Sequence, residues 1–194
     1  ILKSNPGSDL RLKICYQLGE LYSIYLGEYK KAVYNYNEVK QLTEDPLWLI
    51  KTEEKLAEIN FNYRKNYKEA IKNYTLLSEF TPKLKKYDYF QLQIALANYY
   101  LNDTESSIKQ LTKIQSDPNH EYFVRSFYYL GLIYFEKKDF KKAANIYREL
   151  RDFHVREKGR ILLERAWSLY YLKEYSEALG ILKALKSPYF EVSS

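Results

Sequence analysis

Apolar residues recur at every third or fourth position through most of the chain, in short stripes separated by polar turns. One such stripe is Leu18, Leu21, Tyr22 and Tyr25. Because this spacing places side chains on one face of an α-helix, the pattern predicts a series of amphipathic helices. The expected helices lie near residues 9–26, 28–43, 47–63, 66–80, 86–101, 104–115, 119–136, 139–153, 157–172 and 174–186.

Small residues mark a repeat within this series of helices. They are Gly19, Ala57, Ala95, Gly131 and Ala166, at successive steps of 38, 38, 36 and 35 residues. Each is followed after 12 or 13 residues by a second small residue. Where the spacing is 13, we expect the additional residue to lie in the turn between the two helices. Prolines follow the same period: Pro46, Pro82 and Pro118 are 36 residues apart, and Pro188 follows after 70 residues, two further periods. Self-similarity of this length predicts a solenoid of stacked helix pairs.

The small residues and prolines have a simple physical interpretation. A Gly or Ala in the first helix of a pair is expected to let the backbone of the second helix approach closely, with Tyr134 and Tyr147 filling the wider gaps. A proline after the second helix is expected to stop that helix, because proline has no amide donor. The "TEDP" and "QSDP" segments also offer Thr or Asp as caps for the helix that follows.

The stretch YYLGLIYFEKKDFKKAANIY, residues 128–147, resembles the tetratricopeptide repeat at Leu130, Gly131, Tyr134, Ala143 and Tyr147. Noisier copies in register cover nearly the whole chain, and the longer repeats look like those of bacterial multi-repeat proteins of this family. The resemblance implies an all-α fold, a right-handed superhelical solenoid of about five helix pairs. We expect a single array over residues 1–194, with repeats near 9–45, 46–82, 83–118, 119–155 and 156–190. The longer period and the missing proline near Phe153 depart from the family pattern and suggest an irregular superhelix.

The amino-acid composition gives little further indication of function. The chain of 194 residues has 46% hydrophobic and 29% charged residues and a net charge of +6, with acidic and basic residues interleaved. This balance favours solubility over nucleic-acid binding. The single cysteine, Cys15, lies in an apolar helical pattern and is expected to be a buried thiol. No apolar run reaches the length of a transmembrane helix.

No pattern of catalytic or metal-binding residues appears. The chain lacks the nucleophile elbow, the zincin helix motif and the phosphate-binding loop. His120 and His154 have no spaced Cys or carboxylate partners and are expected at the surface. Glu53 and Glu54 are adjacent on one helix and face different ways, so they do not form an acid–base pair. We therefore expect no enzyme activity, no cofactor and no metal.

In the tetratricopeptide family the first helices line an inner groove, and the resemblance carries that role to residues around each small residue. At the N-terminal end these positions hold Tyr16, Glu20, Glu54 and Glu58, and the two glutamates at 54 and 58 disfavour the family's carboxylate clamp. Toward the C-terminal end they are apolar and aromatic, as expected of peptide-binding anchors. The candidate partner-binding residues are Leu96, Tyr99, Arg125, Tyr128, Leu132, Phe135, Leu163, Trp167, Tyr170 and Tyr171. The alternative is that these side chains only pack against neighbouring repeats, or against a further repeat that the given sequence does not include.

The expected function is that of a non-enzymatic scaffold that binds a protein or peptide segment and organises a multiprotein assembly. Resemblance to bacterial envelope proteins suggests an outer-membrane, secretion, pilus or periplasmic flagellar-motor assembly. Two alternatives are a regulatory region of a larger enzyme and a self-assembling structural array. The chain begins at Ile1 and is expected to be a fragment of a larger protein. The sequence leaves the partner, the oligomeric state and the compartment open, the last between the bacterial envelope and the cytoplasm.

Overall fold

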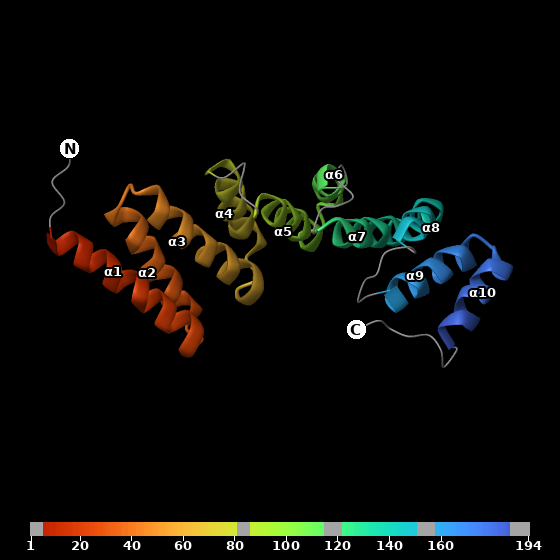
Figure 1. Ribbon diagram of the computed structural model, residues 1–194, viewed down its shortest axis with the longest axis horizontal. Coiled ribbons are helices and arrows are strands. Elements are labelled where there is room, and N and C mark those ends of the chain that lie inside the picture. The colour runs from red at the N-terminus through yellow and green to blue at the C-terminus, as the bar shows by residue number, and fades with distance from the viewer. Residues whose placement is uncertain (1–5, 81–85, 115–121, 151–157, 187–194) are drawn as a thin grey trace. The chain divides into compact units, whose positions relative to one another are not determined.

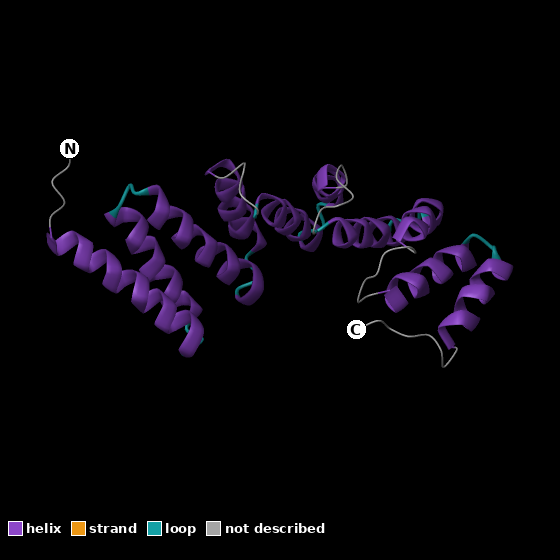
Figure 2. Cartoon of the chain, viewed as in Figure 1, coloured by secondary structure: helices purple, strands orange, loops and turns teal. Residues whose placement is uncertain are grey.

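The computed structural model describes residues 6–80, 86–114, 122–150 and 158–186, and within these ranges every regular element is helical (Figures 1 and 2). Two first helices end in a short π-helical segment, η1 or η2. The elements are α1 (Pro6–Glu20), η1 (Leu21–Tyr25), α2 (Tyr29–Leu42), α3 (Pro46–Glu58), η2 (Ile59–Tyr63), α4 (Tyr67–Phe80), α5 (Tyr87–Tyr100), α6 (Thr104–Ile114), α7 (Phe123–Glu136), α8 (Phe140–Glu149), α9 (Lys158–Tyr171) and α10 (Tyr175–Lys186).

The all-α class and the ten predicted helices are confirmed in the described parts of the chain. Boundaries agree within about three residues, and the predicted ends at 115, 119, 153 and 157 lie outside the described residues. The chain divides into two compact units, residues 1–102 and 103–194, here called unit 1 and unit 2. Each is described by itself. Within each unit, every helix packs against its neighbour in sequence.

The turn inside a helix pair ends one helix and begins the next with the same few residues. Lys138 adopts a left-handed conformation, with φ of 61°. The amide of Lys138 donates to the carbonyl of Phe135, and the amide of Asp139 donates to that of Tyr134, which is the Schellman arrangement. The Asp139 carboxylate then accepts a hydrogen bond from the Lys142 amide at 3.2 Å and caps α8. Gly27, Lys65, Asn102 and Lys173 are the left-handed residues of the other four turns.

The extra residue of the longer spacing lies in the last turn of the first helix, and not in the connecting turn as predicted. In η1 and η2 the backbone widens to hydrogen bonds between residues five apart, Leu26 to Leu21 at 3.2 Å and Arg64 to Ile59 at 3.0 Å. A π-helical turn takes up one more residue without lengthening the loop. The two helix pairs with a 13-residue spacing are those that carry these segments.

The glycines of the first helices admit an aromatic side chain, and not the backbone of the second helix as expected. A Cβ on Gly131 would lie 2.6 Å from the ring of Tyr147, and a Cβ on Gly19 would lie 2.7 Å from the ring of Tyr36. Both tyrosines are fully buried. Removing the Cβ from the first helix therefore makes room for a large ring from the second.

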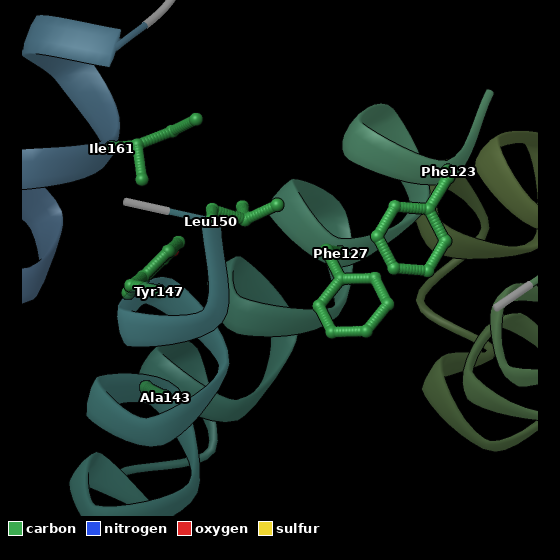
Figure 3. Close-up of a cluster of buried hydrophobic side chains, with 6 residues drawn as sticks. All are labelled: Phe123, Phe127, Ala143, Tyr147, Leu150 and Ile161. Atoms are coloured by element: carbon green, nitrogen blue, oxygen red, sulfur yellow. The ribbon is translucent and has the colours of Figure 1, made fainter. Parts of the chain in front are cut away.

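The core of unit 2 forms where α7, α8 and the start of α9 meet (Figure 3). Phe123 and Phe127 extend from α7 and pack ring against ring, with centroids 4.4 Å apart. Ala143 and Tyr147 of α8 face the same cluster, and Ile161 of α9 closes it at 1% exposure. The apolar stripe read from the sequence is therefore the buried face, as the hydrophobic effect requires.

Pro46 begins a helix, whereas the sequence pattern predicted that it stops the preceding one. The helix α2 ends at Leu42, and Pro46 is the first residue of α3, a position where its missing amide donor is not needed. The "TEDP" cap is confirmed: the Asp45 carboxylate accepts from the Leu47 amide at 2.9 Å. The "QSDP" segment and Pro82, Pro118 and Pro188 lie outside the described residues.

A buried polar network connects α2, α3, η2 and α4 in unit 1. Glu53 is 1% exposed; it forms an ion pair with Lys40 and accepts a hydrogen bond from Asn73 at 2.6 Å. Asn73 accepts from Asn60 at 3.0 Å, and Asn60 accepts from Arg64 at 2.9 Å. The buried carboxylate is tolerated because both of its oxygens have a polar partner.

Candidate protein-binding surface

Unit 2 holds eight of the ten predicted partner-binding residues, on its two first helices. Arg125, Tyr128, Leu132 and Phe135 lie on α7, at intervals of three or four residues that define one helix face. Leu163, Trp167 and Tyr170 lie at the positions of α9 that correspond to Tyr128, Leu132 and Phe135, and Tyr171 follows them; α9 contacts α7. We call these eight residues, together with Arg160, the α7/α9 face.

Two arginines and a tyrosine border a small cavity of about 200 Å³ at the N-terminal ends of α7 and α9. The Arg160 guanidinium lies over the ring of Tyr128, 5.2 Å from its centroid, and Arg125 is exposed beside it. Burial raises the pKa of Tyr128, while Arg160 lowers it and Glu164 raises it by smaller amounts. The cavity thus offers positive charge next to an aromatic wall, which suits a carboxylate attached to an apolar group.

The α9 part of this face is exposed and aromatic. Trp167 is 47% exposed and packs edge-on against Tyr170, with ring centroids 5.7 Å apart. Leu163 is 40% exposed. Tyr171 is half exposed and stacks on Phe140 of α8 at 4.5 Å. Rings held in place by neighbouring rings offer contact area with little loss of side-chain entropy, as binding anchors require.

The other two predicted residues lie in unit 1, on α5, and only one of them has accessible surface. Leu96 is 3% exposed, so its side chain packs inside the protein. Tyr99 is partly exposed and lies against Tyr100, with centroids 5.5 Å apart. The surface that this helix can offer is therefore smaller than the sequence suggested.

The acidic positions of the first two helix pairs lie together in unit 1. The pKa of Tyr16 is raised, first by burial and then by the charges of Glu20, Glu54 and Glu58. Lys55 lies 3.5 Å from Glu20 and Lys86 lies 3.1 Å from Glu54, so two of these carboxylates are paired with lysines. Because lysines balance Glu20 and Glu54, the sequence-based argument that these glutamates disfavour the family's carboxylate clamp stays a prediction.

The described residues contain no cluster of three or more His, Cys, Asp or Glu side chains that could hold a metal ion. Glu53 is buried in the polar network and Glu54 pairs with Lys86, so these neighbours face apart as predicted. Cys15 is a buried free thiol, also as predicted. His120 and His154 lie outside the described residues. None of the described helices has the length and apolar character needed to cross a bilayer.

A larger cavity, about 650 Å³, lies elsewhere, at the turn between η1 and α2 in unit 1. Lys30, Lys31 and Arg64 line it together with Glu28. Glu28 forms an ion pair with Lys31, and the Arg64 guanidinium donates to Asn60. Two of its three cations are thus engaged inside unit 1, and its aromatic lining residue, Tyr29, is stacked on Tyr63.

An apolar face at the C-terminal helix pair was not predicted from the sequence. Tyr175, Leu179 and Leu182 of α10 are 55%, 51% and 41% exposed, and with Trp167 and Tyr170 they line a cavity of about 420 Å³. A signal was present in the sequence. Tyr175 occupies the same repeat position as Tyr29, Tyr67 and Phe140.

Comparisons with known proteins agree with this architecture. Residues 125–154 match the family model described as "Tetratricopeptide repeat". No curated protein matches the chain.

Among solved structures, a crystal structure of MamA protein covers 90% of this chain and 90% of its own, with 16% identity and a TM-score of 0.67. The nearly identical TPR-like repeats of a putative kinesin light chain from Podosopora anserina cover 91% of this chain and 93% of their own, at 16% identity and a TM-score of 0.63. At this identity the likeness shows the fold alone. The family pattern is thus matched in the fourth helix pair, and the chain shares the fold of these repeat solenoids over nine-tenths of its length.

Proposed function

We propose that this protein is a non-enzymatic scaffold that binds a segment of a partner protein on the α7/α9 face. Repeat proteins of this fold use stacked helices to present extended binding surfaces. The observation that carries the proposal is the exposure of Trp167, which is 47% accessible although its ring is held against Tyr170. A large aromatic side chain fixed at the surface is the most common kind of binding anchor.

The chemistry of the face defines the partner segment. Leu132, Leu163 and Trp167 offer apolar surface, while Arg125 and Arg160 supply positive charge at the cavity beside Tyr128. The matching segment carries apolar or aromatic side chains and an acidic residue toward the N-terminal ends of α7 and α9. Binding to a preformed surface has a small reorganisation cost, so mechanism here means docking and not bond chemistry.

The finer proposal places this scaffold in a bacterial envelope assembly at the outer membrane, a secretion system, a pilus or a periplasmic flagellar motor. Its support is the resemblance of the longer repeats to those of bacterial envelope proteins. Fractionation of cells that make the native protein tests this placement: the protein should be recovered with envelope complexes, and recovery in the cytoplasmic fraction alone would contradict it.

Capture of partners from an extract of those cells tests the binding face itself. The chain is compared with a Leu132→Glu/Trp167→Glu variant and with a matched control, Tyr34→Glu/Leu47→Glu, whose residues are 65% and 68% exposed in unit 1. Both variants add two negative charges, and circular dichroism establishes that they are folded. We expect partners that bind the chain and the control but not the first variant. Equal recovery on all three proteins would place the binding site elsewhere.

A further inference from the structure

Arg165 is a buried arginine at a position that is apolar in the other four repeats. It comes directly before Ala166, and the residues in the corresponding places are Leu18, Leu56, Ile94 and Leu130. The last three of these are at most 4% exposed, so the position belongs to the core. Arg165 is itself only 8% exposed. A guanidinium stays charged inside a protein, and burying it is unfavourable unless its donors find acceptors.

Only part of this guanidinium has a partner. Its Nη2 atom donates to Glu177 of α10, whose side chain is 51% exposed. Its Nε atom is shielded from solvent, and no hydrogen-bond acceptor for it is found among the described residues. A buried donor on a charged group is costly to leave without an acceptor, so this atom is suited to a ligand that supplies one.

Arg165 lines a cavity of about 140 Å³ to which α8, α9 and α10 all contribute. These three consecutive helices belong to unit 2, and α9 packs against both of the others (Figure 1). Lys141, Asn145 and Arg148 of α8 also line the cavity, and all three are exposed. The buried arginine can therefore be reached from solvent along polar side chains.

The size and charge of the cavity limit what it can hold. A water molecule takes about 30 Å³ of liquid, and sites for drug-sized ligands measure about 300–1,000 Å³, so this cavity has room for one small polar group. Lys141, Arg148 and Arg165 bring positive charge, and Glu174 and Glu177 bring negative charge. The lining thus has an excess of one positive charge, which a single carboxylate neutralises and a doubly charged phosphate would exceed. Carboxylates are also the acceptors that arginine binds in a bidentate manner.

This cavity is separate from the α7/α9 face. Arg165 lies two residues from both Leu163 and Trp167 on α9. Because an α-helix has 3.6 residues per turn, residues two apart point about 200° away from each other. Arg165 therefore leaves α9 on the side opposite to the proposed aromatic anchors, and a ligand here would not depend on binding at Trp167.

We propose that the cavity lined by α8, α9 and α10 binds a single carboxylate group, with Arg165 Nε as its buried donor. Lys141 and Arg148 supply further positive charge on the exposed side of the site. The carboxylate belongs either to an acidic side chain of a partner protein or to a small free acid. The site explains why an arginine stands where the other repeats have leucine or isoleucine.

NMR observation of the Arg165 Nε–H group tests this site on the 194-residue chain. Sodium acetate replaces sodium chloride stepwise at constant pH and ionic strength. The resonance is identified by its absence from Arg165→Leu, which restores the residue found at Leu56 and Leu130 and is expected to fold. We expect a saturable shift of this resonance. The Nε–H of Arg11, an exposed arginine paired with Glu38, should not follow it.

Glu177→Gln provides a second test, and it keeps Arg165 in place. It removes a negative charge that competes with the ligand, so acetate should bind at least about threefold more tightly. The matched control is Glu69→Gln, because Glu69 occupies the same repeat position in unit 1 and is also paired, with Lys72. The control should leave the affinity unchanged. If Arg165→Leu does not fold, Arg165→Lys identifies the resonance instead.

A peptide with blocked ends and one glutamate distinguishes the two sources of the carboxylate, with its glutamine counterpart as control. A response to the glutamate peptide and to acetate assigns the site to a partner side chain, and a response to acetate alone assigns it to a free acid. The proposal is overturned if the Arg165 resonance does not respond to acetate, or if it shifts no more than that of Arg11. An acetate affinity that is the same in Glu177→Gln and Glu69→Gln overturns it as well.

Discussion

The ring of Tyr147 occupies the space that a side chain on Gly131 would need. The nearest ring atom would lie 2.6 Å from a Cβ at that position, well inside van der Waals contact. The same relationship links Gly19 to Tyr36 in unit 1. A glycine is therefore required at this position of the repeat because the residue that faces it from the second helix is large.

Gly131→Ala should lower the free energy of unfolding by about 1–3 kcal/mol, because overpacking exceeds the gain in helix propensity. Urea denaturation followed by circular dichroism measures the change. In Gly131→Ala/Tyr147→Leu the clash is gone, and alanine should then be no worse than glycine in the Tyr147→Leu background. The control is Gly180→Ala, at a helical glycine with no atom within 4 Å of the new Cβ. It should stabilise the chain by about 0.5–1 kcal/mol, and a destabilising effect there equal to that at Gly131 would refute the steric account.

Lys138→Gly should stabilise unit 2. Lys138 has φ of 61°, a conformation that costs a residue with a Cβ about 1–2 kcal/mol and costs glycine almost nothing. A gain of roughly 0.5–1 kcal/mol is expected in thermal or urea unfolding. The neighbouring Lys137 has φ of −72°, so Lys137→Gly should destabilise instead. Equal effects of the two substitutions would be incompatible with this interpretation of the turn.

Glu53→Ala should destabilise unit 1 by about 3 kcal/mol, since it leaves Lys40 and the buried amide of Asn73 without their carboxylate partner. Glu53→Gln keeps an acceptor for Asn73 and should cost less. Glu38→Ala, which removes an ion pair with the exposed Arg11, should change stability by no more than about 1 kcal/mol. Equilibrium denaturation measures the loss in the free energy of unfolding. If Glu53→Ala and Glu38→Ala lose the same amount, the buried network contributes no more to stability than an exposed ion pair.

Alkaline pH should weaken the fold through its buried tyrosines. Burial is the main cause that raises the pKa of Tyr36, to about 12, and it also raises the pKa values of Tyr74 and Tyr147. A phenol that ionises more easily in the unfolded chain stabilises the folded state fully below its ordinary pKa of about 10, and this contribution is lost as pH rises toward the folded value.

The free energy of unfolding should therefore fall between about pH 10 and about pH 12, and Tyr36→Phe should make that fall less steep. Tyr34→Phe, at an exposed tyrosine, serves as the control and should leave the slope unchanged. Denaturant titrations at a series of pH values measure both slopes. An identical pH dependence for Tyr36→Phe and the unmodified chain would show that burial of this phenol has no such role.

Local periodicity predicted the helices and the repeat because each depends on residues close in sequence. The partners of the small residues were beyond that reach. Tyr147 lies 16 residues after Gly131, and only the packing of α8 on α7 shows that its ring, and not the helix backbone, fills the space. Burial of Glu53 runs against the usual preference of carboxylates for solvent, so no local pattern indicated the network around it.

The candidate face was predicted in part. The family register placed Tyr128, Leu132 and Trp167 on first helices, which the structure confirms. The same register did not reveal that Leu96 is buried, because burial depends on what covers a helix and not on its position in the repeat. Tyr175 was not among the predicted residues because it lies on a second helix, and the family's groove is lined by first helices.

Binding at Trp167 is the central claim, and the chain offers a direct probe of it. The protein has two tryptophans, so Trp48→Phe leaves Trp167 as the only one. Peptides selected from a random library against the unmodified chain are titrated into this variant while tryptophan emission is recorded. The account predicts a saturable emission shift with peptides that carry apolar and acidic residues, and affinity at least about tenfold weaker with Leu132→Glu. Peptides that bind without changing the emission of Trp167, and equally well with Leu132→Glu, would contradict it.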